Sequence, residues 1–194
     1  SDRGDLEMSQ KNLITTILIC MLSGFHFAHA TPMSDQDTQV ISRSALGVWM
    51  LKQDLNQPKY NCAIQFISAK DTQTSFSIFG ATKQSSHATI LFQAKSIPTT
   101  LAPSEMQIQL RQQNLAPTAL KAQLLPSSNV GMLAVNTGDI QQTLKSMRDQ
   151  EKDMQLKLND ATIYTLNYEG LAQARTAMQD CLAGKVVKIK SLKQ

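Results

Sequence analysis

The chain has 194 residues, of which 42% are hydrophobic, 18% charged and 5% aromatic, and its formal net charge at pH 7 is +4. This length suits one domain with a real hydrophobic core. The chain has one tryptophan and no segment in which basic and aromatic residues interleave, so nucleic acid is a poor partner for it.

The first 30 residues predict an exported protein. Residues 1–7 form an upstream segment before a plausible start at Met8, which is followed by Lys11, an apolar run and the small residues that end at Ala30. This is the layout of a signal peptide that is cleaved after Ala30. An uncleaved membrane anchor is the alternative, but the apolar run is shorter than the ~18 residues that a spanning helix needs. We therefore expect a periplasmic or secreted protein with no integral membrane segment after cleavage.

The next segments predict an N-terminal arm and then a series of strands. Residues 31–46 are polar, lack a convincing period and predict a mobile or loosely docked arm. Residues 47–53 form an apolar, strand-like run around Trp49, and a lone tryptophan there is most often a core anchor. Alternating patterns predict further strands at residues 62–68, 75–80, 88–94, 106–111, 119–125 and 130–135. Pro98 and Pro103 bracket a connection that cannot belong to a central strand.

The last third of the chain has the clearest local signals. Residues 136–139 predict a turn that caps a short amphipathic helix at residues 140–147. Residues 154–158 and 161–168 predict a hairpin, because Asn159-Asp160 between them tolerates positive φ. Residues 171–182 change to helical spacing.

About eight short strands and two short helices in the C-terminal third predict a mainly β fold, an antiparallel sandwich or barrel. The expected β-sandwich domain covers residues 47–184, and a basic tail follows at residues 185–194.

Two cysteines, Cys62 and Cys181, remain after the expected cleavage. Cys181 falls on the buried face of the last predicted helix. In an oxidising compartment the two most economically form one disulfide. Two separate buried thiols, each packed as a small hydrophobe, are the alternative.

No combination of residues points to catalysis, a metal or a cofactor. His87 lies beside two serines in a polar loop, where it is read as solvated, since a catalytic pair needs a buried, oriented arrangement. Asp149, Glu151 and Asp153 form one acidic cluster, but the glycine and distal glutamate of a calcium loop are missing. The sequence has no glycine-rich phosphate loop, CxxC or GxSxG. We therefore predict no catalytic residue, no metal site, no cofactor and no enzyme activity.

The C-terminal tail is basic. Its lysines alternate with apolar residues and are Lys185, Lys188, Lys190 and Lys193. The tail either contacts an anionic surface such as lipid or lipopolysaccharide, forms an edge strand blunted by lysines, or frays.

The order of these features resembles that of a known family. The Trp49 strand and a nearby cysteine strand precede the segments GMLAVNTGDIQQTLKSM and MQLKLNDATIYTLNYEGLAQA, in which a small-residue strand leads into a short helix and a hairpin. Leu166, Gly170, Leu171 and Ala174 occupy the places of a strand-Leu-x-x-x-Gly-(Leu/Phe)-x-x-Ala motif. The chain thus resembles the invasion-associated locus B family of exported bacterial proteins. The resemblance implies a β-sandwich in which these residues and Trp49 anchor the core, and a role in host-cell association without a catalytic residue.

Two functions follow as hypotheses. The leading one is an exported, non-enzymatic protein that binds another macromolecule in the envelope or outside the cell. The second is a small periplasmic protease inhibitor of the barrel type, which the strand with Gly47 and Trp49 and the later Cys62 strand resemble. Such inhibitors insert a short N-terminal arm into the protease cleft, and residues 31–44 would be that arm.

Overall fold

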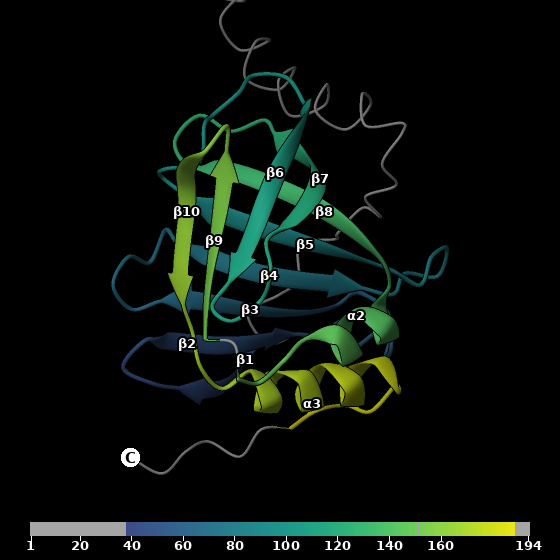
Figure 1. Ribbon diagram of the computed structural model, residues 1–194. Coiled ribbons are helices and arrows are strands. Elements are labelled where there is room, and N and C mark those ends of the chain that lie inside the picture. Colours follow the sequence, from purple (N-terminus) through teal and green to yellow (C-terminus); the bar gives the residue numbers. More distant parts are fainter. Residues whose placement is uncertain (1–37, 151, 189–194) are drawn as a thin grey trace, which may run out of the picture. The chain divides into compact units, whose positions relative to one another are not determined.

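The computed structural model describes residues 38–150 and 152–188, all within the compact unit Met33–Gln194 (Figure 1). The expected signal peptide and residues 31–37 of the expected arm lie outside the described residues.

Ten antiparallel strands form one sheet in the order β1-β2-β3-β4-β5-β8-β7-β6-β9-β10. The strands are β1 (Thr38–Arg43), β2 (Gly47–Lys52), β3 (Cys62–Ser68), β4 (Ser75–Gly80), β5 (His87–Ala94), β6 (Ser104–Gln112), β7 (Thr118–Leu125), β8 (Gly131–Asp139), β9 (Asp153–Leu158) and β10 (Ala161–Asn167). The sheet is not closed into a barrel, because β1 and β10 are its two ends. The expected mainly β, antiparallel and sandwich-like fold is therefore confirmed.

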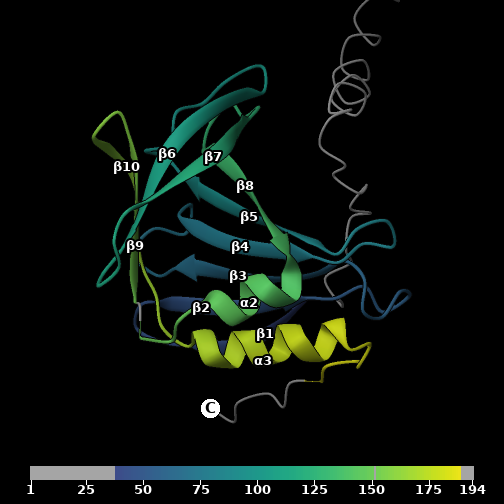
Figure 2. The same cartoon turned by 45° about the vertical axis from the view of Figure 1, so that its right-hand side comes forward.

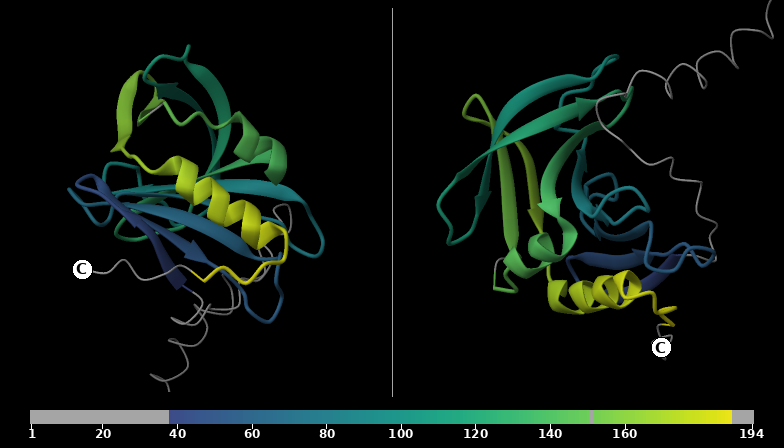
Figure 3. Two further views of the ribbon diagram at one scale, coloured as in Figure 1. Left: turned by 90° about the horizontal axis from the view of Figure 1, so that it is seen from below. Right: turned by 90° about the vertical axis from the view of Figure 1, so that its right-hand side faces the viewer.

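The sheet folds over into two layers. In Figure 1, β6, β9 and β10 stand upright in front of β3, β4 and β5, which run across the view. Two helices, α2 (Ile140–Ser146) and α3 (Leu171–Leu182), follow late in the chain as expected. The shorter, α2, contacts β5 and β8, whereas α3 contacts β1, β2 and β3 (Figures 2 and 3).

Local sequence signals explain the hairpins. Asn159 and Asp160, with φ of 49° and 66°, make the tight turn between β9 and β10. The expected hairpins β3–β4 and β6–β7 are also present. The β1–β2, β2–β3, β4–β5 and β7–β8 pairs also join consecutive strands, whereas β5 pairs with β8 and β6 pairs with β9 across longer stretches of chain.

Two local expectations are wrong. Within the segment expected as an arm, residues 38–43 form β1, which pairs with β2 along its length, because backbone pairing compensates for a polar sequence. Residues 136–139 are not a turn but the end of β8, which pairs with β5 as far as Asp139. A register shift leaves Thr137 out of the ladder, so the strand absorbs the extra residue as a bulge.

Aromatic rings join the two layers. The ring centroid of Phe66 of β3 lies 6.3 Å from that of Tyr168, which follows β10, and the ring centroid of Phe92 of β5 lies 5.3 Å from that of Tyr164 of β10. The buried Tyr164 hydroxyl donates a hydrogen bond to the Ser75 carbonyl of β4 at 2.9 Å. Rings in edge or tilted contact and a satisfied hydroxyl are what a buried aromatic cluster requires.

A disulfide joins Cys62 at the start of β3 to Cys181 in α3, with Cα atoms 6.1 Å apart. Both residues are buried. The expected pairing is confirmed over the alternative of two separate thiols. Such a bond is consistent with an oxidising compartment outside the cytoplasm.

Replacing both cysteines with alanine should destabilise the fold substantially. The bridge closes a loop with a sequence separation of 119 residues, for which the chain-entropy model gives about 5 kcal/mol. Urea unfolding of the oxidised wild type and the C62A/C181A variant measures this difference. Equal midpoints at equal slope would contradict it.

Tyr164→Phe should lower the free energy of unfolding at neutral pH and reduce the loss of stability at alkaline pH. Burial, with a contribution from Tyr168, raises the pKa of Tyr164 well above its usual range. An unfolded tyrosine ionises near pH 10, so the wild type loses stability as the pH rises above that value. The variant lacks this loss but sacrifices a hydrogen bond worth about 1 kcal/mol.

Urea unfolding of both proteins at pH 7 and about pH 11 tests this expectation. The wild type should be the more stable at pH 7, and its advantage should shrink or reverse at the higher pH. A stability difference that does not change with pH would show that Tyr164 ionises as readily in the folded protein as in the unfolded chain.

Candidate functional site

An open cleft of about 440 Å³ lies where β1 ends and α3 begins. It is lined by Ser42, Arg43, Ser44, Asp149, Lys152, Tyr168, Glu169, Gly170, Leu171, Ala172 and Gln173. Three segments that are distant in sequence thus meet around it: the end of β1, the α2–β9 connection and the β10–α3 turn.

The β10–α3 turn sets the shape of the cleft. Gly170 has φ of 82°, and a Cβ there would lie 3.0 Å from Ser42 Oγ and 3.3 Å from Trp49 Cδ1. Glycine is therefore needed both for the backbone conformation and for the close approach. The Trp49 indole N–H donates to the Glu169 carbonyl at 2.7 Å, which fixes the peptide before the helix.

The sequence motif of this region is structural. Trp49, Leu166, Leu171 and Ala174 are all buried, as expected for core anchors. Gly170 is the N-cap of α3 rather than a packed side chain.

The floor of the cleft offers hydrogen-bond donors. No side chain caps α3, its first turn has no acidic residue, and Leu171, Ala172 and Gln173 line the cleft. The first N–H groups of a helix lack partners within the helix. Arg43 and Lys152 contribute positive charge and Glu169 negative charge. This set can orient a polar group, but the cleft lining lacks a histidine to activate its serines.

Arg175 of α3 holds the α2–β9 connection beside the cleft. Its guanidinium lies 2.8 Å from an Asp149 carboxylate oxygen and also donates to the Met147 carbonyl. Asp149 is therefore engaged in an ion pair. Asp153 begins β9, and Glu151 lies outside the described residues. Among the residues that the structure describes, no three His, Cys, Asp or Glu side chains gather as a metal site.

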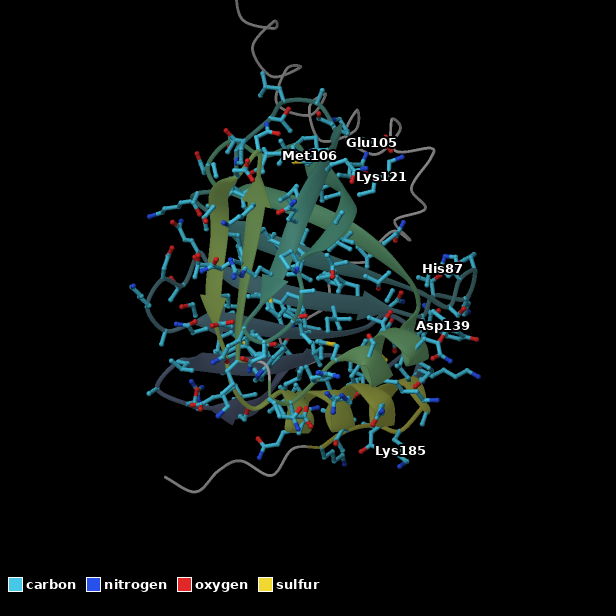
Figure 4. All side chains as sticks on the ribbon, in the orientation of Figure 1. His87, Glu105, Met106, Lys121, Asp139 and Lys185 are labelled. Atoms are coloured by element: carbon cyan, nitrogen blue, oxygen red, sulfur yellow. A yellow bond between two sulfur atoms is a disulfide. The ribbon has the colours of Figure 1, made fainter. Side chains whose placement is uncertain are left out.

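His87 and Asp139 lie close together at the edge of the molecule (Figure 4). His87 is exposed, in agreement with its reading as a solvated residue. Asp139 caps α2 by accepting from the N–H groups of Gln141 and Gln142 at 2.9 and 3.1 Å. The Gln142 hydrogen bond is the largest of the interactions that hold the pKa of Asp139 below its usual range. The carboxylate is thus used to begin a helix.

The start of the basic tail is docked on the sheet. The fully buried Gln53 side chain donates to the Lys185 carbonyl at 2.7 Å and accepts from the Val187 N–H at 3.1 Å. Gln39 of β1 donates to the Val187 carbonyl. Residues 185–187 are therefore held by side-chain amides rather than frayed.

The tail lysines have different environments. Lys185 makes an exposed ion pair of 2.9 Å with Asp180, whose carboxylate partly offsets its charge. Lys188 is exposed. Lys190 and Lys193 lie outside the described residues.

Three features were missed by sequence reasoning: the Gln53 clamp, the Arg175 ion pair and the exposure of Leu101 in the β5–β6 connection. Leu101 is 94% exposed, far more than any other large hydrophobic residue in the described part of the chain. Only the prolines around Leu101 marked that connection in the sequence.

Comparisons with protein-family models, with curated proteins and with solved structures gave no match to this chain. Within residues 38–150 and 152–188, neither helix has the length and apolar character to span a membrane.

Gln53→Ala should release the docked tail. The variant loses both hydrogen bonds of a buried amide, and we expect a cost of about 1–3 kcal/mol together with faster exchange of the Val187 N–H. Hydrogen exchange followed by mass spectrometry measures this, with the exposed Gln179→Ala as the matched control. Unchanged protection of residues 185–188 would show that the clamp does not hold them.

Proposed function

We propose that this protein is exported to the periplasm or the medium and acts by binding another macromolecule, without chemistry of its own. The buried Cys62–Cys181 disulfide is the observation that supports export most directly. In the cytosol of most organisms, such thiols are kept reduced. A bridge between the last helix and an early strand serves a protein that matures in an oxidising compartment.

The charged groups of the described surface support binding over catalysis. Asp149 is paired with Arg175, and Asp139 caps α2, so these carboxylates have structural partners. The cleft is built by the end of β1, the α2–β9 connection and the β10–α3 turn, and binding residues commonly lie on such connecting segments. Its lining combines charged side chains such as Arg43, Lys152 and Glu169 with apolar surface, which suits contact with a partner of mixed character.

The resemblance to the invasion-associated locus B family leads us to propose host-cell association as the process. The last third of the chain, with Leu166, Gly170, Leu171 and Ala174, carries this resemblance. The partner on this proposal is a macromolecule of the bacterial envelope or of the host surface.

Binding without chemistry is testable with fluorescently labelled, oxidised protein. We expect saturable retention on isolated envelopes or host-cell surfaces that excess unlabelled protein displaces and that reduced, alkylated protein does not reproduce. The proposal fails if the purified protein hydrolyses an envelope or peptide substrate and one point mutation abolishes that activity without unfolding the protein.

A protease inhibitor is the second candidate, favoured by the rigid, exposed Leu101 loop. If the N-terminal arm is the inhibitory element, it consists of residues 31–37, because β1 begins at Thr38. A chain that starts at Thr38 should then lose inhibition while it keeps its urea midpoint. Full inhibition by that shortened chain would exclude the arm as the inhibitory element.

A further inference from the structure

The β5–β6 connection, residues 95–103, combines a rigid base with a bare apolar tip. It runs over the upper end of β6 in Figures 1 and 2. Leu101 is 94% exposed, whereas the next most exposed large hydrophobic residue, Val186, is 50% exposed. Single exposed leucines are common on protein surfaces, but Leu101 differs in that the chain is fixed on both sides of it.

The N-terminal side of the loop is fixed at two points. Ile97 is buried, and its carbonyl oxygen lies so close to Gly131 that a Cβ there would approach it to 2.1 Å. Thr100 forms an isolated antiparallel bridge with Ser127, whose N–H donates to the Thr100 carbonyl at 3.0 Å. The residue immediately before Leu101 is therefore part of the sheet framework.

The C-terminal side is fixed as well. Ser104, three residues after Leu101, begins β6 and pairs with Leu124 of β7. The Thr100 hydroxyl spans the tip, since it accepts from the Ala102 N–H at 3.3 Å and donates to the Ala102 carbonyl at 2.8 Å. Thr100 and Ala102 are thus tied together across Leu101.

The chemistry of the tip selects among partners. Residues 96–103, around Leu101, have the sequence SIPTTLAP without a charged or an aromatic residue, and the charge of the connection is confined to the exposed Lys95 at its start. A membrane-inserting loop would present aromatic or basic side chains at the interface. A neutral segment with one projecting leucine instead matches a cleft that binds peptide and has one apolar pocket.

From these observations we propose that the loop around Leu101 docks in the substrate cleft of an endopeptidase with an apolar primary pocket, and that Leu101 fills that pocket. The inference rests on the inhibitor candidate above but replaces the N-terminal arm with the loop as the inhibitory element. A pre-organised loop binds tightly because little conformational entropy is lost.

The fixed positions on either side of Leu101 also explain why such a loop would inhibit a protease instead of being degraded as a substrate. Hydrolysis of the Leu101–Ala102 bond adds one water and leaves a carboxyl group on Leu101 and an amine on Ala102. Both new ends stay in place, because the Thr100–Ser127 bridge and the Ser104–Leu124 pair hold them. Cleavage therefore releases little chain entropy, which lowers the drive toward hydrolysis and keeps the two new ends placed for the bond to re-form.

The test measures inhibition constants of the oxidised full chain against chymotrypsin-type and trypsin-type endopeptidases. Wild type should inhibit the first, and Leu101→Ala should weaken that inhibition about 100-fold or more, as for a central anchor residue. Leu101→Lys should transfer inhibition to the trypsin-type enzyme. Leu55→Ala, at a residue that is 43% exposed elsewhere, is the matched control and should change nothing.

Several outcomes would overturn the inference. They are equal inhibition by wild type and Leu101→Ala, absence of inhibition of either enzyme, or rapid cleavage after Leu101 without inhibition. Loss of inhibition only in the chain that starts at Thr38 would leave the inhibitor function standing and assign it to the arm. If the wild type inhibits neither enzyme but still binds envelopes, the inhibitor function is excluded and binding to a macromolecule of the envelope or host surface remains.

Discussion

The attachment of α3 to the early strands is the constraint on which the rest of the structure depends. Cys181 bonds to Cys62 of β3, and at the other end of the helix Trp49 of β2 donates to the Glu169 carbonyl. The ion pair between Arg175 and Asp149 ties the α2–β9 connection to the middle of α3. Because the β10–α3 turn and Asp149 line the cleft, the same contacts shape its walls.

The two ends of the sheet are protected against pairing with further strands. The β1–β2 register shifts between Val40 and Ser42, and the β10–β9 register shifts between Thr162 and Tyr164. Side chains also occupy backbone groups nearby, since Ser96 donates to the Ile163 carbonyl at 2.8 Å. Bulged and covered edges discourage strand addition, so loops and the cleft are better suited to partners than the edges.

Much of the fold could be predicted because its signals are local. Asn159-Asp160 predicts a hairpin turn, and the change of hydrophobic period after Gly170 predicts a helix. The β5–β8 pairing could not be predicted, because it joins strands that are distant in sequence. β1 could not be predicted either, because its polar sequence lacks a strand period and its backbone pairing with the neighbouring β2 decides it. The disulfide could be predicted because two cysteines remain after the expected cleavage. The hydrogen bonds of Gln53 and the exposure of Leu101 could not, because they depend on which distant segments lie near these residues.

The most direct test of this account is the intact mass of the protein recovered from the exported fraction, alkylated with and without prior reduction. We expect a chain that takes up two alkyl groups on Cys62 and Cys181 only after reduction, because the bond between them holds α3 on the sheet. Uptake of two groups without reduction would mean that both thiols are free, and would contradict the disulfide and the oxidising compartment inferred from it.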